Sequence, residues 1–202
     1  LKNSLIEILS KLDNDKELVA CKGLSLGFNY VNQNLLWTEE YLNHLNYKRN
    51  EDDDFERVDK HISRYRHTLY YSVVRKNIWK KSFSTYLKEE LSINAQAEIM
   101  FEISVSFYGK HCVIPIIHHL RSFESPSIIS DDISLQNSEF EFFELFAKSF
   151  KNNIAEKFLE NMSKIAGKNR QCLFKNNIKK ACQNYSEFYI KKHNPFLIKL
   201  KS

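Results

Sequence analysis

The chain has 202 residues, of which 43% are hydrophobic and 27% are charged, and its net charge is +5. This composition is ordinary for a soluble globular protein and allows one domain with a full core. No stretch approaches the ~20 apolar residues of a membrane span, and we expect no signal peptide. Because the first residue is not Met, we expect a domain cut from a longer chain, in which further domains could flank residues 1–202.

The charge is too mild for a nucleic-acid-binding domain, so we expect no nucleic-acid partner. The densest basic region spans residues 57–75 and carries Arg64, Arg66 and His67 among tyrosines. Basic residues between aromatic ones can bind nucleic acid, but we interpret this run as the solvated face of a helix that faces the acidic run 51–54.

The four cysteines, Cys21, Cys112, Cys172 and Cys182, form no CxxC pair, which excludes a zinc ribbon or a redox pair. Cys172 and Cys182 lie in one predicted helix, nearly three turns apart, and cannot be bridged there. We therefore expect reduced thiols and a cytosolic working compartment.

The first half of the chain predicts helices. Residues 4–12 read as a short amphipathic helix. Apolar residues spaced three and four apart predict a helix over 21–37, after which Thr38 would cap a segment through Leu45. The polar run 50–54 offers good N-cap residues for a long helical stretch over 55–87.

The spacing of the apolar residues then changes from the helical period to alternation. Residues 101–107 alternate apolar and polar side chains, which is typical of a half-buried strand, and Gly109 turns the chain into a second strand over 112–117. Pro115 in that strand implies an edge position or a bulge. After an irregular stretch with a possible strand at 128–129, helical spacing returns over 140–158 and ends near Gly167.

A last helix covers residues 174–188 and stops at Asn194-Pro195. The order of elements predicts an α+β fold, with helices around a small antiparallel sheet.

Three of the four glycines lie beside two residues that could do chemistry. Gly23 and Gly27 follow Cys21, and Gly109 lies two residues before His111. Glycine costs roughly 1 kcal/mol in a helix, so two within one predicted helix indicate that another backbone comes close.

A cysteine that opens a helix is a sensible nucleophile, because the helix dipole and a nearby imidazole stabilise the thiolate. Cys21 occupies that position, and His111 opens the second predicted strand, from which it could face the helix end. The candidates for a third residue that orients the histidine are Glu124, Asp131 and Asp132.

The run Ala20-Cys21-Lys22-Gly23-Leu24-Ser25 resembles the nucleophile motif of the YopT-like papain-fold cysteine proteases of bacterial secreted effectors. Gly109-Lys110-His111-Cys112-Val113-Ile114 is similar to the histidine strand of that family. Phe123-Glu124-Ser125-Pro126 stands where the family has an aromatic-Asp-Pro-Asn loop, with Glu in place of Asp, and a phenylalanine-rich helix follows in both.

The resemblance implies one papain-like domain over residues 1–202, with Cys21 as nucleophile, His111 as general base and acid, and Glu124 as orienter. The oxyanion would be held by backbone N–H groups and by Asn14, since Asp15 would repel it. Such an enzyme needs no cofactor and no metal. It would be secreted by a bacterium and would act on a host protein in the host cytoplasm.

Three alternatives remain open. Gly23-Leu24-Ser25-Leu26-Gly27 matches the G-x-S-x-G elbow of α/β-hydrolases, but lacks the strand that should precede it. His111, Cys112, His118 and His119 could bind metal, but 111 and 119 lie too far apart on one strand to share an ion. Finally, the chain could be a non-enzymatic helical protein-interaction module of a bacterial effector, with Cys21 buried and inert.

Overall fold

The computed structural model describes residues 2–32, 34–40, 44–86, 94–122, 138–147 and 153–193. The α-helices of this part are α1 (Lys2–Asn14), α2 (Asp54–Ile62), α3 (Lys76–Tyr86), α4 (Asn94–Tyr108), α7 (Ser138–Ala147), α8 (Asn153–Ser163) and α9 (Gln171–His193). The strands are β1 (Leu18–Val31), β2 (Asn34–Glu40), β3 (Lys48–Arg49), β4 (Val73–Val74) and β5 (Lys110–Ser122).

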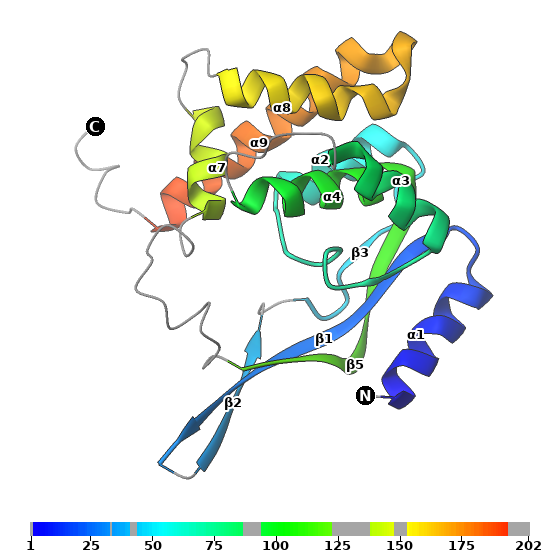
Figure 1. The fold of residues 1–202 in the computed structure, drawn as a ribbon, viewed down its shortest axis with the longest axis vertical. Coiled ribbons are helices and arrows are strands. Elements are labelled where there is room, and N and C mark those ends of the chain that lie inside the picture. Colours follow the sequence, from blue (N-terminus) through cyan, green and yellow to red (C-terminus); the bar gives the residue numbers. More distant parts are fainter. Residues whose placement is uncertain are drawn as a thin grey trace.

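The fold is α+β, as predicted. The described helices other than α1 lie together above the sheet, whereas α1 lies apart from them beside β1 and β5 (Figure 1). Within the described ranges, no helix combines the length and the apolar character that a membrane crossing requires.

The sheet is mixed, so the expectation of an antiparallel sheet is wrong. Its strand order is β2-β1-β5-β3, and β4 pairs with β1. β1 and β5 run parallel, while the other pairs are antiparallel. The chain between β1 and β5 contains three helices and is long enough for the crossover that a parallel pair needs. The strand predicted over 112–117 is confirmed as the middle of β5.

Two apolar clusters flank the sheet. The larger one joins Val19 and Ala20 of β1 to the buried faces of the helices, and the smaller one consists of Ile8, Leu12, Leu18 and Cys21. Because Ile8 and Leu12 come from α1, the helix predicted over 4–12 is confirmed, and its apolar face covers the second side of the sheet.

The helix predicted over residues 21–37 is wrong. This segment forms most of β1 and the start of β2, joined by a two-residue turn in which Asn32 has φ 49°. A positive φ is what a tight hairpin turn requires, and asparagine tolerates it. The segment predicted from Thr38 is wrong as well, because Thr38 belongs to β2.

The strand predicted over 101–107 is also wrong, because these residues form the second half of α4. The alternation of apolar and polar residues suggested a half-buried strand. This half of α4 is buried on all sides, so its polar residues are buried as well. Glu102 binds two backbone amides, and the Ser104 Oγ donates to the Met100 carbonyl one turn earlier, at 2.8 Å.

The long helical stretch over 55–87 is interrupted, with α2 and α3 separated by an irregular segment and β4. Its predicted N-cap is confirmed, since the Asp53 carboxylate accepts from the Glu56 N–H at 2.7 Å. The helix predicted over 140–158 is divided between α7 and α8. Gly167, with φ 74°, ends the short 3₁₀ turn after α8, and α9 confirms the last helix. The predicted strand at 128–129 and the stop at Asn194-Pro195 lie outside the described residues.

Gly23 confirms the expected close approach of another backbone. A Cβ at this position would lie 2.4 Å from the Ile116 carbonyl oxygen and 2.6 Å from the His118 Cβ. The approach arises because the β1–β5 register shifts between Lys22 and Leu24, as expected of a bulge around Pro115. The contact between the two central strands therefore depends on the missing side chain.

We predict that Gly23→Ala lowers the free energy of unfolding by about 1–3 kcal/mol, because the added methyl group would overlap backbone atoms that cannot move aside. Urea denaturation measures this. The matched control is Ser84→Ala on the exposed side of α3, which should change stability by less than ~0.5 kcal/mol. Equal stability of Gly23→Ala and the wild type would contradict the close approach.

Candidate functional site

Cys21, the predicted nucleophile, lies within β1 and not at the start of a helix. It pairs with Val73 on one side and with Cys112 on the other, and it is completely buried against α1. The Cys112 thiol lies 3.8 Å from the Cys21 sulfur, across the parallel strands. Cys21 is therefore not at the N-terminus of a helix, where the helix dipole would stabilise a thiolate.

His111 lies on the opposite face of the sheet from Cys21. It is opposite Ala20, which belongs to the larger core beneath the helices, whereas the next residue, Cys112, faces α1. Neighbouring strand residues point to opposite faces. The His111 ring contacts the rings of His61 and Tyr47, at centroid distances of 5.1 and 6.0 Å. The structure therefore does not bring the predicted Cys21–His111 pair together.

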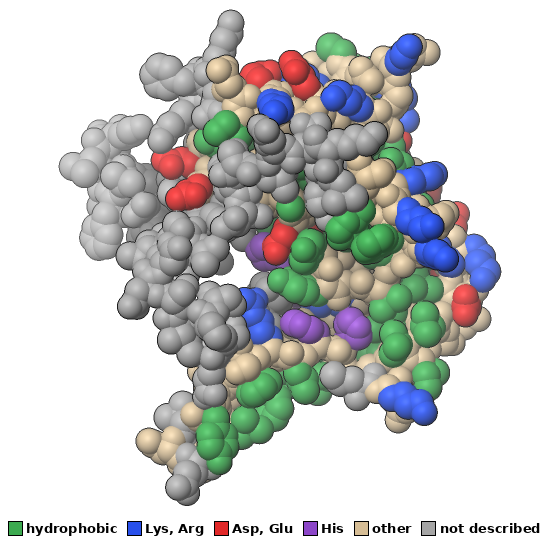
Figure 2. Space-filling view, in the orientation of Figure 1, with side chains coloured by type: hydrophobic (Ala, Val, Ile, Leu, Met, Phe, Trp, Pro, Cys, Tyr) green, Lys and Arg blue, Asp and Glu red, His purple; other side chains and the backbone are tan. Residues whose placement is uncertain are grey.

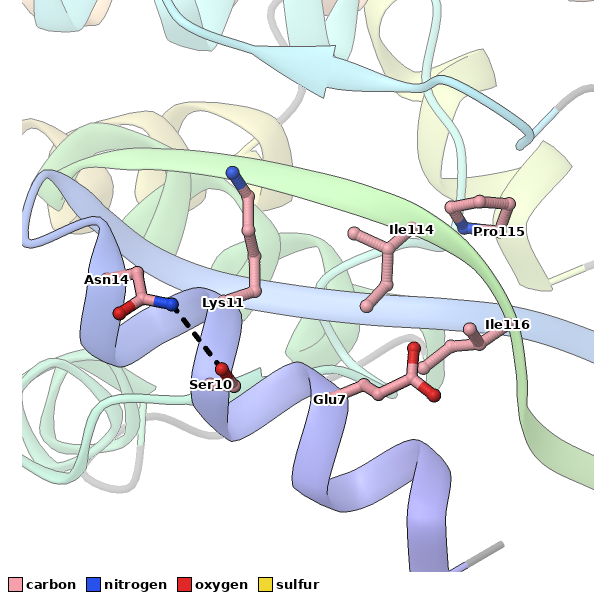
Figure 3. Close-up of a pocket in the computed structure, with 7 residues that line it drawn as sticks. All are labelled: Glu7, Ser10, Lys11, Asn14, Ile114, Pro115 and Ile116. Atoms are coloured by element: carbon pink, nitrogen blue, oxygen red, sulfur yellow. Dashed lines mark hydrogen bonds between the residues drawn. The ribbon is translucent and has the colours of Figure 1, made fainter.

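The other predicted site residues are Glu124, Asp131, Asp132 and Asn14. Glu124, Asp131 and Asp132 lie outside the described residues. Asn14 is at the C-terminal end of α1, where its amide donates to the Ser10 hydroxyl at 3.4 Å. Figure 3 shows Asn14 at the rim of a cavity of about 400 Å³ between α1 and β5, with Lys11 pointing toward the strand.

The two adjacent thiols have different acidities. The hydrogen bond with Cys112, followed by burial, raises the pKa of Cys21 far above its usual range. The same bond lowers the pKa of Cys112, and Lys11 contributes in the same direction. Because a nucleophilic cysteine needs a stabilised thiolate, Cys21 is the less reactive partner.

A buried polar chain lies on the helical side of the sheet. The Tyr47 hydroxyl is 2.5 Å from His61 Nδ1, and His61 Nε2 is 2.7 Å from Glu102 Oε2. The amides of Leu69 and Tyr70 donate to the second oxygen of Glu102 at 2.9 and 3.0 Å. A neutral His61 satisfies every contact, if Tyr47 donates to Nδ1 and Nε2–H donates to the carboxylate.

Burial keeps the histidines of this region neutral. It lowers the pKa of His61 to about 3 and raises the pKa of Glu102 to about 7. His44 also falls to a pKa of about 3, mainly through burial, and the pKa of His111 is lowered well below its usual value. Tyr47, His61 and Glu102 are groups of the kind that form an acid–base relay. Because all three are buried, they instead connect α2, α4 and the segment before β3.

The alternative enzyme and metal motifs find no suitable geometry. Ser25 of the G-x-S-x-G match lies within the continuous strand β1 and is buried, whereas an elbow needs a sharp turn. Among the residues that the structure describes, no three His, Cys, Asp or Glu side chains are grouped so that they could hold a metal ion.

A different surface stands out. Along β1, Leu24, Leu26, Phe28 and Tyr30 alternate with small or polar residues. Their large apolar side chains therefore lie on one face of the sheet. The apolar residues of β2 and β5 that pair with them share this face. We call the whole set the distal apolar face; it consists of Leu24, Leu26, Phe28, Tyr30, Leu35, Trp37, Ile117 and Leu120.

Much of the distal apolar face is open to solvent. Tyr30 is 59% exposed, Trp37 52% and Leu35 44%. Figure 2 shows hydrophobic side chains gathered along the hairpin that projects at the lower left. The Phe28 and Trp37 rings are 5.6 Å apart and hold the two strands in register. Exposed apolar patches of this kind mark interaction sites.

The distal apolar face continues to the edge of the sheet. β2 is the terminal strand in the order, and its outer edge pairs with no other strand of the described part. Such an edge offers a row of backbone donors and acceptors to another chain.

The sequence carries a signal for this surface alongside the helical spacing. Leu24-Ser25-Leu26-Gly27-Phe28-Asn29-Tyr30 alternates apolar and small or polar residues with a strict period of two, and asparagines follow as hairpin-turn residues. The same leucine and phenylalanine positions also fit a spacing of four, which led to the helix prediction.

Comparison with known proteins adds no relative. No protein-family model, no curated protein and no solved structure matches the chain.

Thiol labelling tests the placement of the cysteines. With iodoacetamide near pH 7.5, we expect exposed Cys172 to react first and half-buried Cys112 next, with Cys21 and Cys182 reacting slowly. Mass spectrometry of peptides follows each site. Cys21→Ala should slow the labelling of Cys112, because it removes the hydrogen bond that lowers the Cys112 pKa. Preferential labelling of Cys21 that depends on His111, tested with His111→Gln, would instead support a catalytic pair.

Acid should destabilise the fold. Histidines ordinarily titrate near 6.5, so the unfolded chain binds protons below that pH, whereas His44 and His61 stay neutral in the folded chain down to about 3. Glu102 acts in the opposite direction, because its raised pKa favours the folded state below about 7. The combined effect of His44 and His61 exceeds that of Glu102, and His111, whose pKa is also lowered, acts in the same direction as the other two histidines.

The free energy of unfolding should therefore fall between pH 6.5 and 4.5 by at least ~1.4 kcal/mol per pH unit, the value for one net proton. Urea titrations at several pH values measure the slope. His44→Gln should reduce this slope by the contribution of about one proton, ~1.4 kcal/mol per pH unit. A stability that does not change over this range would show that the histidines are not buried in their neutral form.

Proposed function

We propose that this chain is a protein-interaction module that binds an extended segment of a partner protein along β2. The observation that carries the proposal is the continuity between the distal apolar face and the edge of β2 that pairs with no other described strand. An edge strand supplies main-chain hydrogen bonds to an added strand, and adjacent apolar side chains supply the contact area and the selectivity.

The proposed partner has a definite chemistry. β2 exposes Leu35 and Trp37 on one face, so an added strand would place apolar side chains at alternate positions beside them. The segment is therefore extended and amphipathic.

A second copy of the chain fits this edge less well. Full-length antiparallel self-pairing of β2 places Trp37 against itself and Leu35 opposite Glu39. A strand from another protein meets no such restriction.

The hydrolase function that the resemblance implies remains a separate hypothesis. A papain-like enzyme secreted by a bacterium would need Cys21 and His111 in one site, and the observed strands place them on opposite faces. We therefore propose the interaction function in its place. A host protein, met after secretion, remains the expected kind of partner.

Peptide titration tests the proposal. The probe is a synthetic seven-residue peptide of alternating Val and Thr, which matches the length of β2. We expect shifts of the β2 backbone amides in NMR spectra and slower hydrogen exchange along the edge. Leu35→Thr and Trp37→Thr should each weaken binding by about tenfold, because each removes ~1.5 kcal/mol or more of apolar contact.

Leu36→Thr is the matched control, because Leu36 is 55% exposed but points to the opposite face from its two neighbours. It should change affinity less than either of them. Equal effects of the three substitutions, or no shift in β2, would contradict the proposal. So would a dimer in analytical ultracentrifugation that Trp37→Thr abolishes, since a second copy would then cover the face.

A further inference from the structure

Two cysteines from distant parts of the chain meet between the central strands. Cys21 of β1 and Cys112 of β5 are direct partners in the parallel ladder, 91 residues apart in the sequence, and their sulfur atoms are 3.8 Å apart. Both side chains face α1, because Cys112 packs against the small apolar cluster that contains Cys21. The missing CxxC motif excludes a redox pair that is close in the sequence, whereas this pair is formed by the fold.

The positions of the two cysteines are compatible with a disulfide bond. Neighbouring strands of a sheet lie about 4.8 Å apart. A disulfide joins residues whose Cα atoms are about 4.4–6.8 Å apart. The two sulfur atoms are already within hydrogen-bond distance of each other across the strands. A bond between them therefore requires rotation of two side chains, and β1 need not separate from β5.

The two thiols differ in access and in acidity. Cys112 is half-buried, whereas Cys21 is completely buried. The hydrogen bond with Cys21 lowers the pKa of Cys112 against the effect of burial; Lys11 lowers it further, and Asp15 acts in the opposite direction. Lys11 also lines the cavity between α1 and β5 and points toward the strand (Figure 3). A small oxidant in solution therefore meets Cys112 first, and meets it as the better nucleophile.

The other two cysteines are placed differently. Cys182 is buried in the larger core, on the helical side of the sheet, and Cys172 is exposed on α9. The sheet lies between Cys182 and the pair that faces α1. Cys21 is therefore the thiol that is positioned to react with a modified Cys112.

We infer that Cys112 is an oxidation site for hydrogen peroxide and that Cys21 converts the oxidised Cys112 into an intramolecular disulfide. In the first step the Cys112 thiolate attacks one peroxide oxygen, the O–O bond breaks, and Cys112 becomes a sulfenic acid. The hydroxide that leaves takes up the proton that Cys112 released. In the second step the Cys21 sulfur attacks the Cys112 sulfur, the S–O bond breaks, and water leaves with the Cys21 proton. The two sulfur atoms lose two electrons, which reduce the peroxide to two water molecules.

The position of Cys21 decides the fate of the sulfenic acid. Without a neighbouring thiol, a second peroxide oxidises a sulfenic acid irreversibly to a sulfinic acid. Because the Cys21 sulfur is adjacent, the disulfide forms first, and a dithiol reductant restores both thiols. The bridge links β1 to β5 on the side that α1 covers, so the inference does not depend on binding at the β2 edge.

Peroxide treatment of the intact, reduced chain tests the inference. The protein is exposed to hydrogen peroxide, the remaining thiols are blocked with iodoacetamide, and the peptides are mapped by mass spectrometry without reduction. We expect a disulfide-linked pair of peptides that contain Cys21 and Cys112 as the main oxidised product of these two residues, and its full return to thiols with dithiothreitol. The inference is overturned if this pair is absent and Cys112 is found as a thiol, as a sulfinic acid or linked to Cys172.

Dimedone, which traps sulfenic acids, tests the order of the two steps. Cys21→Ala removes the second thiol, so the dimedone adduct at Cys112 should increase by about tenfold over the wild type. Cys182→Ala is the matched control, because it removes another completely buried thiol from the other side of the sheet, and it should change the adduct by less than about twofold.

Equal increases in the two variants would show a general loosening of the fold and would overturn the inference. A dimedone adduct on Cys21 of the wild type in place of Cys112 would overturn it as well. The peptide map of the wild type needs no substitution, so it decides the question even if Cys21→Ala does not fold.

Discussion

The parallel pairing of β1 with β5 is the constraint on which the rest of the structure depends. It joins segments about ninety residues apart, from the Leu18–Lys110 pair to the Phe28–Ser122 pair. Its register directs Ala20 and His111 toward the helices and Cys21 and Cys112 toward α1. Because one ladder separates the two faces, a single shift in register would exchange the residues of both cores. The absence of a side chain at Gly23 lets β5 approach closely enough to hold that register.

Buried polar groups complete the arrangement on the helical side. The Arg57 side chain donates to the carbonyls of Ser106 and Phe107 at the C-terminal end of α4, where a positive charge also favours the helix dipole. Glu102, from the middle of the same helix, binds His61 of α2 and the amides of Leu69 and Tyr70. These contacts fix the irregular segment between α2 and β4.

The sequence indicated the fold class, α1, β5, the cap at Asp53 and the close approach at Gly23, since each depends on local chemistry. It did not indicate that α4 is buried all round, because its polar residues have partners that are distant in the sequence. The candidate site was predicted from spacing and from the resemblance of short motifs, and neither can tell on which face of a sheet Cys21 and His111 point. The apolar alternation from Leu24 to Tyr30 was readable, but it coincided with helical spacing, and only the pairing with β2 resolves the two.

The length of β1 has a mechanical consequence for binding. The strand runs without interruption for 14 residues from the buried end between β4 and β5 to the hairpin tip. The hairpin is thus continuous with the core strands, and the edge of β2 that we propose as a binding site is formed before a partner arrives. Association would lose little conformational entropy on this side, so a few contacts can give useful affinity. A pull applied to the bound partner would be transmitted along the backbone directly to Gly23 and to the β1–β5 ladder.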